Sequence, residues 1–212
     1  MSKSTLVELS KETVARGGLL LTCMLGLLVA CGVSNVTISG SYPTPNVEKL
    51  PVKIAVYYDE ALTEYSYVEY TETGNEEFDI RSGQSHMDLF DAILPAMFEQ
   101  VVRVDSMEEA QSSEVDAVFA PAIEEFQLAL PYKTKLDVYE VWIKYNMRLM
   151  STDGEYIADW VATSYGKTPT ETFRSSEAAI NEAAFIALRD LASTFTLNFR
   201  DVPEVSDWLA SR

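Results

Sequence analysis

The feature that most constrains the fold is an alternating stretch within residues 137–165. Every second residue from Tyr139 to Leu149 is apolar or aromatic, and the residues between them are mostly polar. This period of two is typical of a β-strand with one buried face. Asp153-Gly154 follows and favours a two-residue hairpin turn. The sequence therefore predicts a long antiparallel hairpin.

One register of this hairpin suits both of its faces. It places Thr152 opposite Glu155 across the turn. Arg148 then lies opposite Asp159 on the outer face, which makes a favourable charge pair. The inner face pairs Leu149 with Ala158, Met147 with Trp160 and Tyr145 with Ala162.

The remaining periodicities predict an α+β fold. We expect a mostly antiparallel sheet with helices packed on one face, in a single domain. Pro95 should kink or divide its helix, and a slip in the apolar phase predicts a bulge within 121–125. The expected strands cover 52–58, 65–70, 76–81, 101–104, 115–130 and the hairpin. The expected helices cover 82–100, 106–112, 175–200 and 204–211.

The N-terminal stretch has the pattern of an export signal. Lys3, Lys11 and Arg16 precede an apolar run from Gly18 to Ala30. That run is shorter than the roughly 20 residues that a membrane-spanning helix needs, and its length suits the core of a signal peptide.

The end of this run, Leu28-Val29-Ala30-Cys31-Gly32, resembles the bacterial lipobox. The resemblance implies cleavage before Cys31 and lipid on its sulfur and amine, and two or more acyl chains anchor a protein stably. In lipobox proteins an Asp after the cysteine tends to retain them in the inner membrane. Gly32 stands there, so the outer membrane is favoured. The alternatives are an uncleaved anchor helix, or a disulfide between Cys31 and Cys23.

These observations divide the chain into three parts. Residues 1–30 are the predicted signal peptide. Residues 31–51 are rich in Ser, Gly, Pro, Thr and Asn, which predicts a lipidated flexible tether. Residues 52–212 are the predicted globular domain, long enough to bury one ordinary core without disulfides.

The charge of the chain excludes one class of partner. The sequence has 16 Lys and Arg against 33 Asp and Glu, and without residues 1–30 these become 13 and 31. Such an acidic surface repels nucleic acid and anionic head groups. We therefore expect no nucleic-acid partner.

The C-terminal third is similar to YajG-type lipoproteins and to other small envelope lipoproteins, which include auxiliary lipoproteins of lipid-transport systems. The segments that carry this resemblance are Ser164-Tyr165-Gly166, Ala179-Ile180-Asn181-Glu182-Ala183 and Val205-Ser206-Asp207-Trp208-Leu209. The resemblance implies a non-catalytic assembly or accessory subunit.

No residue pattern predicts catalysis, a metal or a cofactor. His86 is the only histidine, and no G-x-S-x-G motif surrounds it or the nearby serines, so we expect a solvent-facing side chain near a helix start. The acidic pairs at 76–77, 108–109 and 124–125 lack the ligand spacing of a calcium loop. A carboxylate pair for glycoside cleavage depends on folded geometry, and the sequence does not select one.

Aromatic residues supply the candidate contact surface. Tyrosines are dense at positions 57, 58, 65, 67 and 70, and they either line a strand face and pack under a helix or form a partner surface. By alternation Trp142 points away from the core and lies beside Tyr165 across the hairpin, which predicts a second layer or an interface. The predicted partner-binding residues are Trp142, Tyr165, Tyr65 and Tyr67.

The resulting hypothesis is an envelope lipoprotein held on the periplasmic face of the outer membrane by lipid on Cys31. It would act without catalysis as a binding, assembly or accessory subunit that docks another envelope protein or its own copies. The alternative is a periplasmic carrier or chaperone that encloses a lipid or peptide in an apolar cavity, and a hydrolase is the third reading. An apolar pocket with convergent polar groups would favour the carrier, and an exposed aromatic patch the docking subunit.

Overall fold

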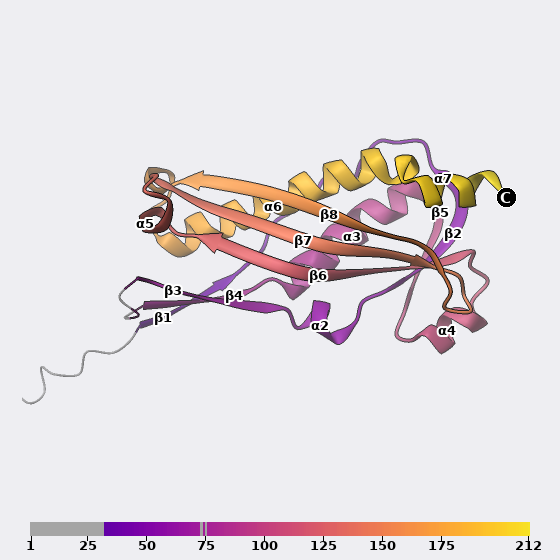
Figure 1. Ribbon diagram of the computed structural model, residues 1–212, viewed down its shortest axis with the longest axis horizontal. Coiled ribbons are helices and arrows are strands. Elements are labelled where there is room, and N and C mark those ends of the chain that lie inside the picture. Colours follow the sequence, from indigo (N-terminus) through magenta and orange to yellow (C-terminus); the bar gives the residue numbers. More distant parts are fainter. Residues whose placement is uncertain (1–31, 73, 75) are drawn as a thin grey trace, which may run out of the picture. The chain divides into compact units, whose positions relative to one another are not determined.

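The computed structural model describes residues 32–72, 74 and 76–212 (Figure 1). The predicted signal peptide and Cys31 lie outside the described residues. Residues Val33–Arg212 form one compact unit around a five-stranded sheet of order β5-β2-β6-β7-β8. Its strands are β2 (Leu50–Tyr57), β5 (Phe98–Val104), β6 (Ala117–Ala129), β7 (Val138–Met150) and β8 (Tyr156–Pro169).

The α+β class is confirmed, but the sheet is mixed. β2 pairs in parallel with both β5 and β6, whereas β6, β7 and β8 pair antiparallel. Parallel neighbours need crossover connections, and the chain from β2 to β5 carries the helix α3 (Gly83–Met97). The chain from β5 to β6 carries the short helix α4 (Met107–Ser112).

The predicted hairpin register is confirmed from Leu149 to the far end of the strands, with Leu149 opposite Ala158 and Arg148 opposite Asp159. It shifts between Leu149 and Met150, so that Met150 lies opposite Tyr156. The Ser151 N–H donates to the backbone oxygen of Glu155 at 2.8 Å, so three residues, 152–154, form the turn, and the predicted two-residue turn with Thr152 opposite Glu155 is wrong. Gly154 has a φ of 84° in the turn, a conformation that glycine adopts without a steric penalty. The predicted bulge is also present, because the β6–β7 register shifts between Ile123 and Glu125.

Helices α3 and α6 (Ser176–Asn198) cover one face of the sheet. Ser175 begins α6 by accepting a hydrogen bond from the backbone N–H of Ala178, 3.2 Å away. Pro95 lies inside α3, in its last turn, and the helix ends at Met97. The α6 residues buried against the sheet are mostly small, which lets the helix approach closely: Ala179, Ile180, Ala183, Ala184, Ala187, Leu188 and Leu191.

The helices do not all lie on one face, which corrects that part of the prediction. Ala110 of α4 packs on the opposite face, in a small cluster with Ala55, Val104 and Val118. Alternate residues of β2 therefore enter two separate clusters, since Ile54 lies in the main core and Ala55 in this one.

A second sheet contains three strands in the order β1-β4-β3, which are β1 (Gly32–Thr37), β3 (Ser66–Tyr70) and β4 (Glu76–Arg81). The stretch predicted as a flexible tether therefore belongs to the folded domain, and the expected boundary at residue 52 is wrong. Burial of its few apolar side chains, Val36, Ile38, Tyr42 and Leu50, outweighs the turn-rich composition of the residues between them.

The remaining elements are short. They are the helices α2 (Glu60–Thr63), α5 (Pro131–Thr134) and α7 (Pro203–Ala210) and the 3-10 turns η1 (Thr170–Thr172) and η2 (Phe199–Asp201). Within the described ranges, every helix is too short or too polar to cross a bilayer.

Candidate functional site

The helices leave the middle of the outer face of β6, β7 and β8 open. The main core gathers α3, α6 and α7 on the inner face of these strands. On the outer face α4 packs mainly against β2 and β5. Within the described part of the chain, the middle of the β6–β8 outer face is therefore free of helix, and this face is turned toward the viewer in Figure 1.

Trp142 and Tyr165 meet on this outer face, as predicted. They are paired across β7 and β8, and their ring centroids lie 5.0 Å apart with the planes inclined by 38°. The Trp142 side chain remains 39% exposed. The strand alternation that buries Val141 and Ile143 turns Trp142 outward, so a large aromatic surface is presented to solvent.

Hydrogen bonds hold this aromatic pair in place. The Tyr165 hydroxyl donates to Oε1 of the buried Glu140 at 2.6 Å. Loss of solvation, and then the hydrogen bond to Glu140, raise the pKa of Tyr165 to about 12, so the hydroxyl keeps its proton. The backbone N–H of Tyr165 donates to Oδ2 of Asp190 in α6, 3.1 Å away.

Polar groups surround a shallow hollow beside Trp142. The hollow has a volume of about 300 Å³, and its lining includes Glu125, Gln127, Lys144 and Thr163. Lys144 Nζ lies 2.6 Å from Glu124 Oε2, and the hydrogen bond to that carboxylate raises the pKa of Lys144. An aromatic centre with a polar rim is the usual anatomy of a protein interface.

Two residues of this face were missed by the sequence analysis. Glu140 orients Tyr165, and alternation with Trp142 could have placed its side chain on the same face. Asn146 lies on the same strand face, and its buried Oδ1 has no hydrogen-bond partner. A buried acceptor without a donor costs free energy.

Tyr65 and Tyr67, the other predicted contact residues, lie elsewhere. Their rings pack on Phe126 of the core, with centroids 6.3 and 5.1 Å away. Both side chains are half-buried, so they support the packing interpretation of the tyrosine cluster. The structure does not bring them together with Trp142.

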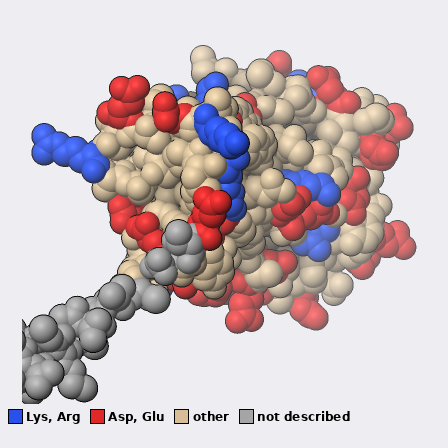
Figure 2. Space-filling view, turned by 60° about the vertical axis from the view of Figure 1, so that its left-hand side comes forward, with Lys and Arg blue, Asp and Glu red and all other residues tan. Residues whose placement is uncertain are grey.

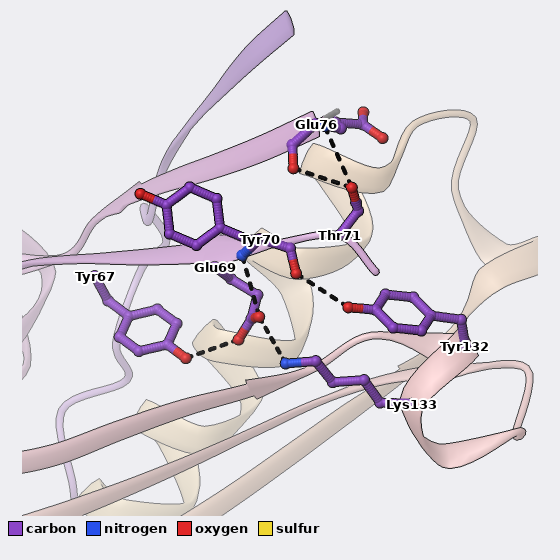
Figure 3. A network of polar contacts seen from close by, with 7 residues as sticks. All are labelled: Tyr67, Glu69, Tyr70, Thr71, Glu76, Tyr132 and Lys133. Atoms are coloured by element: carbon purple, nitrogen blue, oxygen red, sulfur yellow. Dashed lines mark hydrogen bonds and ion pairs between the residues drawn. The ribbon is translucent and has the colours of Figure 1, made fainter. Parts of the chain in front are cut away.

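Tyr67 also belongs to a polar network between β3 and α5 (Figure 3). Its hydroxyl donates to Oε2 of the buried Glu69 at 2.8 Å, and Lys133 Nζ lies 2.6 Å from Oε1 of the same carboxylate. The Tyr132 hydroxyl donates to the backbone oxygen of Tyr70 at 3.0 Å. These bonds join segments that are more than sixty residues apart in the sequence.

His86 is buried, and the expectation that it faces solvent is wrong. Its Nε2 lies 3.0 Å from Ser82 Oγ, and its Nδ1 lies 2.6 Å from the Tyr145 hydroxyl. Burial lowers the pKa of His86 to about 3, so the ring is neutral near neutral pH. Ser82 is buried as well, so this Ser–His pair stabilises the core and is closed to a substrate.

The carrier hypothesis requires an enclosed apolar cavity, but the hollows found are shallow. One of about 290 Å³ lies between Pro43, Val47, Ile93 of α3 and Leu197 of α6, with Arg189 at its rim. It is mainly apolar but lies at the lower limit of ligand-pocket volumes. In the described ranges, no cluster of three His, Cys, Asp or Glu side chains is arranged to hold a metal ion.

Comparison with known proteins identifies similar folds. No family model and no curated protein matches the chain. A DUF330-family protein from Xanthomonas campestris has a similar fold, with a TM-score of 0.52 and 14% identity over 83% of this chain and 98% of that chain. This likeness shows the fold alone.

Two weaker likenesses illustrate the range of similar structures. One is a PelC dodecamer from Paraburkholderia phytofirmans, with a TM-score of 0.41 and 20% identity over 73% of this chain and 91% of that chain. The other is a minor lipoprotein from Acinetobacter baumannii, with a TM-score of 0.40 and 12% identity over 71% of this chain and 92% of that chain. The resemblance to YajG-type lipoproteins stays a prediction.

Proposed function

We propose that this protein is a lipid-anchored, non-enzymatic accessory subunit on the periplasmic face of the outer membrane. It docks another envelope protein through the outer face of β6–β8, with Trp142 at the centre of the contact. The observation that carries this proposal is the Trp142–Tyr165 pair, with Trp142 exposed and Tyr165 half-buried, on a sheet face that no helix of the described residues covers. The lipobox at Cys31 supports the anchor and the compartment.

A protein is the partner that this surface fits best. Tryptophan and tyrosine dominate the binding energy of many protein interfaces, because they bury a large area at a low entropic cost. Glu140 already holds the hydroxyl of Tyr165, so the tyrosine side chain has little freedom left to lose on binding. The acidic chain favours a partner with a basic docking surface.

The absence of catalysis is part of the proposal and rests on the site chemistry. The outer face offers carboxylates, amides, an amine, aromatic rings and the hydroxyl of Thr163 opposite Lys144. The ion pair with Glu124 keeps Lys144 protonated, so Lys144 is not a base for that hydroxyl. A nucleophile with an adjacent base would be needed for covalent catalysis. The Ser82–His86 pair has that composition but lies in the core.

Site-specific photocrosslinking tests the docking surface. Replacing Trp142 by p-benzoylphenylalanine in the lipidated protein should give a discrete crosslinked product larger than the protein alone. The same replacement at Leu197, which is exposed on α6, is the matched control and should not give that product. Trp142→Ala should abolish recovery of the same partner from solubilised envelopes.

Three results would count against the proposal. Identical products from positions 142 and 197 would show that the contact is not specific to this face. Unchanged recovery of the partner with Trp142→Ala would remove Trp142 from the interface. A crosslinked product with twice the mass of the chain would show that the partner is a second copy of this protein and not another envelope protein.

A further inference from the structure

Several segments that are distant in the sequence meet at the end of the domain where β1 begins. The side chain of Ser34 hydrogen-bonds to Glu177 in the first turn of α6, and bonds from the backbone N–H of Glu177 and from Ser34 lower the pKa of Glu177. The Tyr139 hydroxyl, near the start of β7, donates to Ser176 Oγ at 2.7 Å. The first residues of β1, β7 and α6 therefore lie at one end, on the left in Figure 1.

Apolar side chains are exposed at this end in unusual number. Of the ten large apolar side chains that the described residues expose, five belong to β1, β3, α5 and the residue pair after α5. They are Val33, Val68, Tyr70, Tyr132 and Leu136. Figure 2 turns this end forward and shows uncharged surface between scattered acidic and basic side chains.

The exposed groups are held on a rigid support. The Glu69–Lys133 ion pair and the hydrogen bond from Tyr132 to the Tyr70 backbone join α5 to β3 (Figure 3). Lys135 follows with a φ of 56°, and this left-handed residue precedes the exposed Leu136. These contacts preorganise an apolar and aromatic tip.

The predicted lipid site is very close to this tip along the chain. Cys31 precedes Val33 by two residues, and two residues span at most about 7 Å. Val36 and Ile38 are fixed in the core, so the domain has no flexible connection of twenty residues to its anchor. Acyl chains on Cys31 would bring the surface of a bilayer to this end.

We propose that this end of the domain rests on the membrane, with Val33, Tyr70, Tyr132 and Leu136 in the interfacial layer of the lipid. The inference rests on the lipid anchor of the proposed function. Tyrosine favours the membrane–water interface because its ring is apolar and its hydroxyl polar. Lys135 beside Leu136 extends its amine toward water while its methylenes lie along the lipid.

The charge of the protein selects the kind of membrane. Without residues 1–30 the protein has 31 acidic against 13 basic side chains, and this excess of negative charge opposes a strongly anionic surface. Glu72 and Glu76 stand on the β3–β4 turn at the same end. A zwitterionic surface, such as phosphatidylethanolamine with phosphatidylcholine, therefore fits the tip better than an anionic one.

Spin labelling of the lipidated protein tests this orientation. After removal of the signal peptide and acylation of Cys31, an introduced cysteine is the only free thiol. Leu136→Cys and Leu197→Cys form a matched pair, because these leucines are 56% and 70% exposed. Leu197 lies twenty-one residues beyond the first residue of α6, which places it about 30 Å along the helix.

A second pair of label positions controls for a local effect of any single label. Tyr70→Cys and Tyr156→Cys replace tyrosines that are 55% and 63% exposed, and Tyr156 begins β8 at the far end of the hairpin. In phosphatidylethanolamine–phosphatidylcholine vesicles, we expect labels at 136 and 70 to lose collisions with a water-soluble nickel chelate severalfold and to gain collisions with oxygen. Labels at 197 and 156 should collide with the nickel chelate as often as a label that is fully exposed to water.

The outcomes separate the orientation from the anchor. If the protein floats with the vesicles but all four labels are equally accessible to nickel, the orientation is wrong and the anchor stands. If labels at 197 and 156 are the protected ones, the opposite end faces the lipid. If the processed protein carries no acyl chains and does not float, the anchor fails and the orientation fails with it.

Discussion

At the residue scale, the most informative side chain is a histidine that stays neutral. His86 lies between the hydroxyls of Ser82 and Tyr145, and each of its ring nitrogens has one partner. A protonated ring would carry an N–H donor on both nitrogens, so both hydroxyls would have to accept, and it would place a charge in a medium of low polarity. The neutral ring therefore contributes to stability, and this contribution depends on pH.

We predict that acid destabilises the protein through His86. The unfolded chain binds a proton below the ordinary histidine pKa of 6.5, whereas the folded protein does so only near 3. Below pH 6.5 the unfolded state therefore holds more protons, and stability falls as the pH falls toward 3, by up to about 1.4 kcal/mol per pH unit.

Urea denaturation between pH 7 and pH 4 measures this slope. The control is His86→Gln, which removes the titrating ring and leaves the carboxylates that titrate in the same range. The variant should be less stable at pH 7 and should lose less stability on acidification than the original protein. Equal pH slopes for the two proteins would show that His86 is not the titrating group.

At the element scale, the contact between β8 and α6 depends on one position without a side chain. A Cβ atom on Gly166 would lie 2.1 Å from the backbone oxygen of Ala183 and 2.4 Å from the backbone nitrogen of Ala187. Both atoms belong to the helix backbone, which cannot move aside as a flexible side chain can. At Gly166 the helix and the strand are therefore too close for any side chain to fit between them.

We predict that Gly166→Ala costs about 3 kcal/mol of unfolding free energy, because it forces the helix away from the sheet. Gly74→Ala is the matched control. Gly74 has open space around it and a φ of 66°, so its substitution should cost only about 1 kcal/mol of backbone strain. Chemical denaturation of both variants tests this, and equal costs would contradict the close approach.

At the scale of the whole molecule, the domain begins near the predicted lipid site. Residues 32–50 cross the domain and contact α6, where Ser39 N–H donates to Asn181 Oδ1 at 2.9 Å and the Tyr42 ring lies 5.2 Å from that of Phe185. Tyr42 also shares a buried hydrogen bond of 2.6 Å with Ser85 of α3. This segment therefore joins two helices and is a structural part of the fold.

We predict that a chain beginning at Val52 is far less stable than one beginning at Val33. The shorter chain loses the buried side chains of Val36, Ile38, Tyr42 and Leu50, each of which contributes about 1.5–3 kcal/mol. That sum is comparable to the whole stability of a typical domain, about 5–15 kcal/mol. Near-ultraviolet circular dichroism and urea midpoints of the two chains measure the difference, and matching midpoints would restore the tether interpretation.

Part of the candidate site follows from residues that are close in the sequence, and part depends on contacts between distant segments. The sequence alone predicted that Trp142 and Tyr165 would be neighbours on the outer face. The period of two determines the side of each residue, and the position of the turn determines the register from Leu149 onward, although the turn itself holds one residue more than predicted. The sequence did not predict that Glu140 and Asp190 hold Tyr165, because Asp190 reaches the strand edge only after α6 has packed on the sheet.

The sequence by itself determined the hairpin register, the bulge in β6, the course of the long helices and the lipobox resemblance, since each depends on residues that are near neighbours in the chain. Only the tertiary structure decided that β2 runs parallel to β5 and β6, that His86 and Tyr65 lie inward, and that residues 32–50 are folded. The physical reason is that periodicity shows which face of an element is apolar. Which surface covers that face depends on contacts between segments far apart in the sequence, and no local pattern contains them.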